Sequence, residues 1–104
     1  MRIEYKHTAL LDLQQTQDYI ANTLKNKPAA QKLVSSVLHD ISLLAHNPRM
    51  GTALNSRFGV DSDLRFIVVS KQLVFYQIVS DDMISIVRIL DGRRDYLSIL
   101  FLFE

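Results

Sequence analysis

The sequence predicts an α+β fold in which an antiparallel sheet packs against a helical hairpin. The first half of the chain holds two amphipathic helical patterns separated by a short break, and the second half holds three runs of β-branched and aromatic residues. The expected order is β-α-α-β-β-β, followed by a short C-terminal helix or tail. Because the chain has 104 residues, 48% of them apolar, we expect a single domain over residues 1–104.

A short strand and a first helix begin this order. Met1–Lys6 alternates weakly between apolar and polar residues, which predicts a strand. Thr8 is expected to cap the following helix, with Asp12 near the first turn, where a carboxylate stabilises the helix dipole. Apolar residues at helical spacing extend this helix to about Leu24.

The second helix has the stronger pattern. Pro28 stands in the first turn, where proline is tolerated, and Asn47-Pro48 ends the helix. The apolar stripe of this helix consists of Ala30, Leu33, Val34, Val37, Leu38, Ile41, Leu44 and Ala45. Because the break at Asn26–Pro28 is short, we expect the two helices to be antiparallel neighbours.

A loop and three strands follow. Asn47–Asp63 contains proline, glycine and scattered polar residues, which predicts a connection with room for one short helical turn. The predicted strands are Leu64–Val69, Leu73–Val79 and Met83–Leu90, joined by short turns at Ser70–Gln72 and Ser80–Asp82. The middle strand is apolar on both faces, which is typical of a central strand covered by helices on one side.

The C-terminal segment is strongly apolar. Asp91-Gly92 ends the last strand, and Arg93–Phe103 returns to large apolar residues. A segment of this composition is expected to dock on the sheet as a short helix or to bind a partner.

Composition and spacing argue against several kinds of site. The chain has no cysteine, which excludes disulfides and thiolate chemistry. His7, His39 and His46 are too widely spaced to share a metal ion, and glycine-rich phosphate loops are missing. We therefore expect no metal and no small-molecule cofactor. The first residues lack the apolar segment of a secretory signal, and no apolar run approaches about 18 residues. We expect a cytoplasmic protein that does not enter membranes.

A group of arginines follows the last predicted strand. Arg88, Arg93 and Arg94 fall within seven residues, with Asp91 between them and Asp95 directly after them. Forked guanidinium donors suit phosphate and carboxylate oxygens, so the group is a candidate binding surface. The alternative is a solvated cluster in which the aspartates neutralise the arginines. The net charge of +1 does not decide between them.

Arg65 and Tyr96 are further candidates. Arg65 begins a strand near the end of the sheet opposite to Arg88, so only a strong twist or the loop would bring the two together. Tyr96 follows the arginines and suits stacking on a base or proton transfer. The alternative for Tyr96 is a half-buried packing role.

The chain resembles the RelE/ParE superfamily of toxins from bacterial type II toxin–antitoxin systems over nearly its whole length. The resemblance is carried by the Leu-x-x-x-Pro-x-x-Gly pattern in Leu43–Gly51, by Leu64-Arg65, by Val74–Tyr76, and by Ile86–Leu90 followed by Arg94-Asp95. It implies a β-α-α-β-β-β fold and a small cytoplasmic toxin that is neutralised by a cognate antitoxin protein.

Two mechanisms occur in this superfamily. RelE-like members cut messenger RNA on the ribosome without a metal ion, whereas ParE-like members inhibit DNA gyrase and cleave nothing themselves. The resemblance places Arg94 where the RelE-like group has a catalytic arginine. Leu73 and Leu100, however, stand where that group has a second arginine and a tyrosine.

The closing Arg-Ile-Leu-x-x-Arg-x-Asp pattern is more similar to the ParE-like group, so the resemblance favours inhibition of DNA gyrase. The target-binding candidates are Arg65, Arg88, Arg93, Arg94 and Tyr96. The alternative is a ribosome-dependent mRNA endonuclease, an mRNA interferase. Its catalytic candidates are Arg94, Arg93, Arg88 and Lys71, which would stabilise phosphate charge, and Tyr96, which would transfer a proton. A third possibility is an inactive homologue that retains only antitoxin binding.

Overall fold

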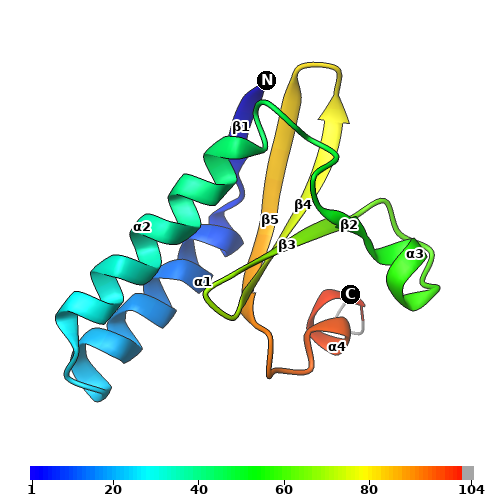
Figure 1. Cartoon of the computed structure of the whole chain (residues 1–104). Coiled ribbons are helices and arrows are strands. Elements are labelled where there is room, and N and C mark those ends of the chain that lie inside the picture. Colours follow the sequence, from blue (N-terminus) through cyan, green and yellow to red (C-terminus); the bar gives the residue numbers. More distant parts are fainter. Residues whose placement is uncertain (102–104) are drawn as a thin grey trace.

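A computed structural model describes residues 1–101 of the chain, and it confirms the predicted α+β fold (Figure 1). The strands are β1 (Arg2–Tyr5), β2 (Thr52–Ala53), β3 (Arg65–Val69), β4 (Gln72–Ser80) and β5 (Met83–Asp91). The helices are α1 (His7–Asp18), the π-helical turn η1 (Tyr19–Thr23), α2 (Lys27–Leu43), α3 (Leu54–Phe58) and α4 (Tyr96–Phe101). No helix within residues 1–101 is long and apolar enough to cross a membrane.

The strands form one sheet in the order β1-β5-β4-β3-β2. The three long strands form the predicted antiparallel meander, with β4 between β3 and β5. β1 joins the outer edge of β5 in parallel, so the sheet is mixed and not wholly antiparallel. The short strand β2, which pairs with β3 through Thr52 and Ala53, was not predicted because two residues carry no periodicity.

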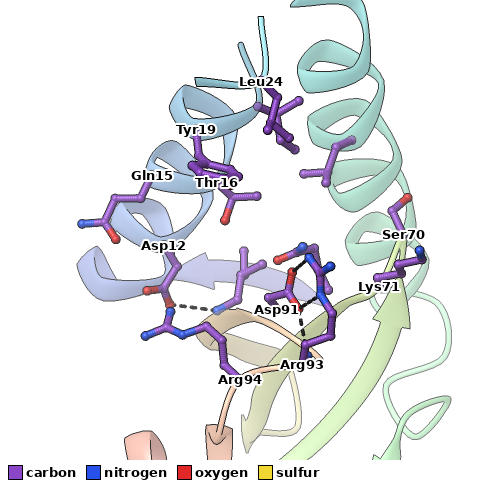
Figure 2. Close-up of a pocket in the computed structure, with 14 residues that line it drawn as sticks. Asp12, Gln15, Thr16, Tyr19, Leu24, Ser70, Lys71, Asp91, Arg93 and Arg94 are labelled. Carbon is purple, nitrogen blue, oxygen red and sulfur yellow. Dashed lines mark hydrogen bonds and ion pairs between the residues drawn. The ribbon is translucent and has the colours of Figure 1, made fainter. Parts of the chain in front are cut away.

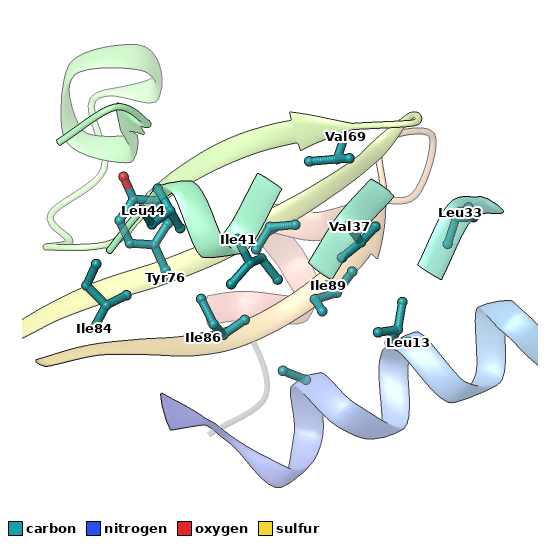
Figure 3. Close-up of a cluster of buried hydrophobic side chains, with 12 residues drawn as sticks. Leu13, Leu33, Val37, Ile41, Leu44, Val69, Tyr76, Ile84, Ile86 and Ile89 are labelled. Atoms are coloured by element: carbon teal, nitrogen blue, oxygen red, sulfur yellow. The ribbon is translucent and has the colours of Figure 1, made fainter. Parts of the chain in front are cut away.

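The helical hairpin covers one face of this sheet, where the larger group of buried side chains lies (Figure 3). β4 contributes Val74 and Tyr76 to this face, and α2 contributes Val37 and Ile41, all four almost fully buried. Most of the apolar stripe predicted for the second helix therefore lies in the helix-side core, but Leu38, which was predicted to belong to it, is 42% exposed.

The opposite face of the sheet is also covered, which explains why β4 is apolar on both sides. Leu73 and Phe75 of β4 point to this second core, together with Leu54 and Leu90. The residues packed against them from α3 and α4 include Phe58, Tyr96, Leu97, Ile99, Leu100 and Phe101. The prediction that the C-terminal segment docks as a short helix is confirmed as far as Phe101; Leu102 and Phe103 lie outside the described residues.

The helix ends differ partly from the prediction. Thr8 was expected to be the N-cap of α1, but the N-cap is Lys6, and the Thr8 hydroxyl donates to the Val87 carbonyl at 3.0 Å. Thr8 therefore ties the helix to β5. In α2, Pro28 lies in the first turn as expected, and the Asn26 side chain accepts a hydrogen bond from the Ala29 N–H at 3.1 Å.

The loop after α2 is fixed by one buried tyrosine. The Tyr76 hydroxyl donates to the Pro48 carbonyl at 2.7 Å and accepts from the Gly51 N–H at 2.9 Å. A Cβ atom on Gly51 would lie 2.6 Å from that hydroxyl, so any side chain would displace it. Gly51, the glycine of the Pro-x-x-Gly pattern, therefore allows the loop to lie close against the sheet.

Candidate functional site

A groove of about 410 Å³ lies where the end of the helical hairpin, the β3–β4 turn and the end of β5 meet (Figure 2). Its helical wall consists of Asp12, Gln15, Thr16, Tyr19, Ile20, Leu24 and Leu33. Its sheet wall consists of Ser70, Lys71, Gln72, Ile89, Asp91, Arg93 and Arg94. We call this the basic groove, because three of the predicted cationic residues line it.

Arg93 is held at the groove by Asp91. The Asp91 carboxylate accepts from Arg93 Nε at 2.9 Å, from a terminal guanidinium nitrogen at 2.7 Å and from the Arg93 backbone N–H at 2.8 Å. These bonds lower the pKa of Asp91 from its ordinary 3.8 to about 2, and they raise the pKa of Arg93. The Arg93 side chain is still 81% exposed, so it can contact a partner while paired.

Arg94 and Lys71 supply the uncompensated charge of the groove. Both are exposed, and both line the groove. Within residues 1–101 neither side chain forms an ion pair or a hydrogen bond with another residue. Since Asp91 balances Arg93, these two side chains give the groove an excess of positive charge at its rim.

Arg88 was predicted to belong to the exposed arginine group, but its side chain is mostly buried and paired with Asp12. Its Nε and a terminal nitrogen donate to the two oxygens of Asp12 at 2.7 and 2.8 Å. The side chains of Arg88 and Asp12 are only 26% and 7% exposed. The Asp12 carboxylate also accepts from the Ile89 N–H at 3.0 Å. Hydrogen bonding to Asp12 raises the pKa of Arg88. Asp12 was expected to interact with the helix dipole; it joins α1 to β5 instead.

Arg65 and Tyr96 do not line the basic groove. A terminal nitrogen of Arg65 donates to the carbonyls of Gly51 at 2.7 Å and Arg49 at 3.2 Å, so this side chain holds the loop after α2. Tyr96 packs in the second core, with ring centroids 5.6 Å from Phe75 and 6.0 Å from Phe58. The structure therefore brings Lys71, Arg93 and Arg94 together, but not Arg65 or Tyr96.

Three groove residues escaped the sequence reasoning. Tyr19 belongs to the π-helical turn, whose irregular spacing no periodicity reveals. Gln72 was assigned to a turn, whereas it begins β4 opposite Asp91 and is 4% exposed. The burial of Asp12 could have been predicted from the sequence, because Asp12 lies beside Leu13 and three residues after Ala9, both on the buried face of α1. Within the described chain, no three His, Asp or Glu side chains are grouped closely enough to hold a metal ion.

Comparisons with known proteins now identify the family. A solved structure titled "Chromosomal ParDE TA system from P. aeruginosa" superposes with a TM-score of 0.71 and 19% identity, over 88% of this chain and 95% of that one. It shares the fold. No curated protein matches the sequence. The family described as "ParE toxin of type II toxin-antitoxin system, parDE" matches residues 3–96. The resemblance to the RelE/ParE superfamily is thereby confirmed, and the chain belongs to the ParE toxin family of type II toxin–antitoxin systems.

Proposed function

We propose that this toxin arrests growth by inhibiting DNA gyrase in the cytoplasm, and that a cognate antitoxin neutralises it. Membership in the ParE toxin family supports the toxin class, and the similar solved structure comes from a ParDE system. Gyrase inhibition needs a surface that binds a macromolecule, and the cationic rim of the basic groove meets that need. Its proposed contacts are Lys71, Arg93 and Arg94.

The observation that carries this proposal over RNA cleavage is that the Tyr96 ring packs in the second core and does not line the basic groove, although its backbone N–H donates to the Arg94 carbonyl at 2.9 Å. A general acid or base must lie within hydrogen-bond reach of the proton that it transfers. Tyr96 packs against Phe75 in the second core, whereas Arg94 lines the basic groove. Arg88, another catalytic candidate, is neutralised by Asp12. Of the catalytic candidates of the mRNA-interferase alternative, Arg88 and the Tyr96 ring are therefore engaged in other contacts, while Lys71, Arg93 and Arg94 line the groove together.

The test is to purify the toxin and assay gyrase supercoiling and ribosomal toeprinting side by side. We expect inhibition of supercoiling and no new cuts in translated mRNA. Arg94→Ala should relieve both toxicity and gyrase inhibition, because it removes an exposed cation without disturbing a described contact. Arg2→Ala is the matched control, since Arg2 is an exposed arginine paired with Asp82. If Arg94→Ala stays as toxic as the parent at equal soluble level, the proposed contact is wrong.

Tyr96→Phe separates the two mechanisms further. The ring packs against Phe58 and Phe75, and no hydrogen bond of its hydroxyl occurs within residues 1–101. We therefore expect Tyr96→Phe to retain toxicity. Loss of toxicity in a folded Tyr96→Phe protein, together with ribosome-dependent cuts, would establish the mRNA-interferase alternative. A chain that affects neither assay but binds an antitoxin would be an inactive homologue.

The antitoxin is proposed to cover apolar side chains that the helical hairpin leaves exposed. Leu10 and Leu11 of α1 and Leu38 and Leu43 of α2 are between 40% and 48% exposed. Large exposed apolar side chains favour a protein partner. Co-expression with the small acidic protein of the neighbouring reading frame should restore growth and yield a purified complex. Failure of that protein to bind would refute this pairing and leave the gyrase assay unaffected.

A further inference from the structure

We propose that the basic groove binds a nucleotide, with the base between the apolar walls and the phosphate at the cationic rim. This inference goes beyond gyrase inhibition, because it concerns a ligand of the isolated protein. It rests on three independent features of the groove: an unpaired acceptor in its lining, uncompensated cations at its rim, and apolar walls that carry an aromatic ring.

The unpaired acceptor is the carbonyl oxygen of Gln72. This side chain lines the groove, is 96% buried, and its Oε1 has no hydrogen-bond partner within the described residues. Of the two polar atoms of this amide, Oε1 is the one that is buried without a partner among the described residues. A buried acceptor without a partner is costly, and a ligand with an N–H donor would satisfy it.

The rim presents donors. Figure 2 shows Arg93 and Arg94 rising from the segment after β5, and Lys71 at the β3–β4 turn. The groove carboxylates Asp12 and Asp91 already accept from Arg88 and Arg93. Lys71 and Arg94 therefore remain to bind an anion, and a phosphate oxygen suits both a guanidinium and an ammonium group.

The walls between these two ends suit a flat aromatic ring. Ile20, Leu33 and Ile89 supply apolar surface, and the half-exposed Tyr19 supplies a ring for stacking. A volume of about 410 Å³ lies within the range of small-molecule sites, roughly 300 to 1,000 Å³. An aliphatic or phenyl side chain of an acidic peptide would fill the walls but has no N–H donor of its own for Gln72. A base with an exocyclic amino group satisfies all three features, because amide oxygens accept from such groups.

Reaching Gln72 requires a small movement, because its Oε1 is shielded from water in the empty groove. The neighbouring Lys71 side chain is exposed and makes no described contact, so we expect it to move aside as the base enters.

The test is an NMR titration of the full-length protein with adenosine monophosphate, adenosine and ribose 5-phosphate. We expect saturable binding of adenosine monophosphate at micromolar to millimolar concentrations, with shifts at Tyr19, Ile89 and the Gln72 side-chain amide. Adenosine and ribose 5-phosphate should each bind about tenfold more weakly, because each lacks one of the two polar ends.

Two variants locate the ends of the ligand. Gln72→Met keeps the length of the side chain but removes its carbonyl. It should weaken the binding of adenosine monophosphate about tenfold and leave the binding of ribose 5-phosphate unchanged. Arg94→Ala should weaken the binding of both phosphate compounds and leave the binding of adenosine unchanged. Arg2→Ala should leave the binding of all three compounds unchanged. Should Gln72→Met fail to fold, adenosine monophosphate compared with its N6-dimethylated form tests the same contact in the parent protein.

A last comparison shows whether the groove binds a free nucleotide or the end of a nucleic acid. A 5′-phosphorylated adenine tetranucleotide that binds more tightly than adenosine monophosphate would assign the groove to a nucleic-acid end, and equal affinity would assign it to a free nucleotide. The proposal is overturned by a lack of saturable binding at millimolar adenosine monophosphate, by equal binding of ribose 5-phosphate, or by tighter binding of an acidic peptide at the same residues. None of these outcomes depends on gyrase, so the two proposals fail separately.

Discussion

Asp12 joins α1 to β5 through three hydrogen bonds. Its carboxylate accepts from Nε and a terminal nitrogen of the Arg88 guanidinium and from the Ile89 N–H. Asp12→Asn removes the charge but keeps the shape, leaving a three-quarters buried guanidinium without its counterion. We expect a loss of about 2 kcal/mol in the free energy of unfolding, below the range for fully buried pairs because Arg88 retains some contact with water.

Urea unfolding at neutral pH measures this change. Asp18→Asn is the control, because Asp18 is an exposed carboxylate on the same helix, and its effect should stay within about 0.5 kcal/mol. Equal midpoints for the parent and Asp12→Asn would show that the ion pair contributes no net stability.

The Asp91–Arg93 ion pair makes the free energy of unfolding depend on pH in the acid range. Because hydrogen bonds from Arg93 lower the pKa of Asp91 in the folded state to about 2, the pair stabilises the fold fully above the unfolded value of 3.8. That contribution is lost as the pH falls from about 4 to about 2. We expect Arg93→Gln to return the Asp91 pKa toward 3.8, which a carboxyl-carbon NMR titration measures. An Asp91 pKa that stays near 2 in the variant would mean that another group holds it down.

The residue types near the site were predictable from the sequence, but their pairing was not. The spacing of Arg88, Arg93 and Arg94 suggested one open cluster, yet Arg88 pairs with a carboxylate 76 positions earlier. Such a long-range partner leaves no trace in local spacing. Arg93, by contrast, pairs with Asp91 two positions away, which is the neutralisation that the sequence offered as an alternative.

Among the elements, the β3–β4 turn is the one most open to improvement. Ser70 and Lys71 have φ values of 51° and 67°, a conformation that favours asparagine and glycine. Ser70→Asn with Lys71→Gly should therefore raise the free energy of unfolding by about 1 kcal/mol. The same change removes the Lys71 ammonium group, so toxicity should fall while stability rises.

Chemical denaturation and a growth assay test the two halves of this prediction. Asp81→Gly in the β4–β5 turn is the control, because Asp81 does not have a positive φ, and glycine should give no gain there. A double variant that is stabilised and equally toxic would remove Lys71 from the proposed target contacts.

The elements themselves were largely predictable, with informative exceptions. α2 follows a strong helical periodicity and the strands β3 to β5 follow runs of β-branched and aromatic residues, and their observed bounds differ by only a few residues from those predicted. The turn η1 and strand β2 were missed for different reasons. η1 interrupts the period of the first helix, and β2 exists because Thr52 and Ala53 meet β3 in space.

At the level of the whole molecule, one sheet separates two cores. Tyr76 and Phe75 are neighbours in β4 but lie in different cores, one under the helical hairpin and one under α3 and α4. The basic groove lies at the end of this arrangement, where α1, η1, β5 and the β3–β4 turn all contribute residues. Leu33 and Ile89 in its apolar lining are part of the helix-side core.

Because the two cores share β4 and β5, we expect them to unfold together. Leu44→Ala lies in the helix-side core and Leu90→Ala in the second core, and both side chains are almost fully buried. Each should cost about 3 kcal/mol through lost burial and a cavity, and each should shift the midpoint of the same transition. Circular dichroism, together with the ring resonances of Tyr76 and Tyr96 as probes of the two cores, measures this. If Tyr96 lost its folded signal before Tyr76 in Leu90→Ala, α4 would be an independent unit, and the C-terminal segment could detach while the helical hairpin stayed on the sheet.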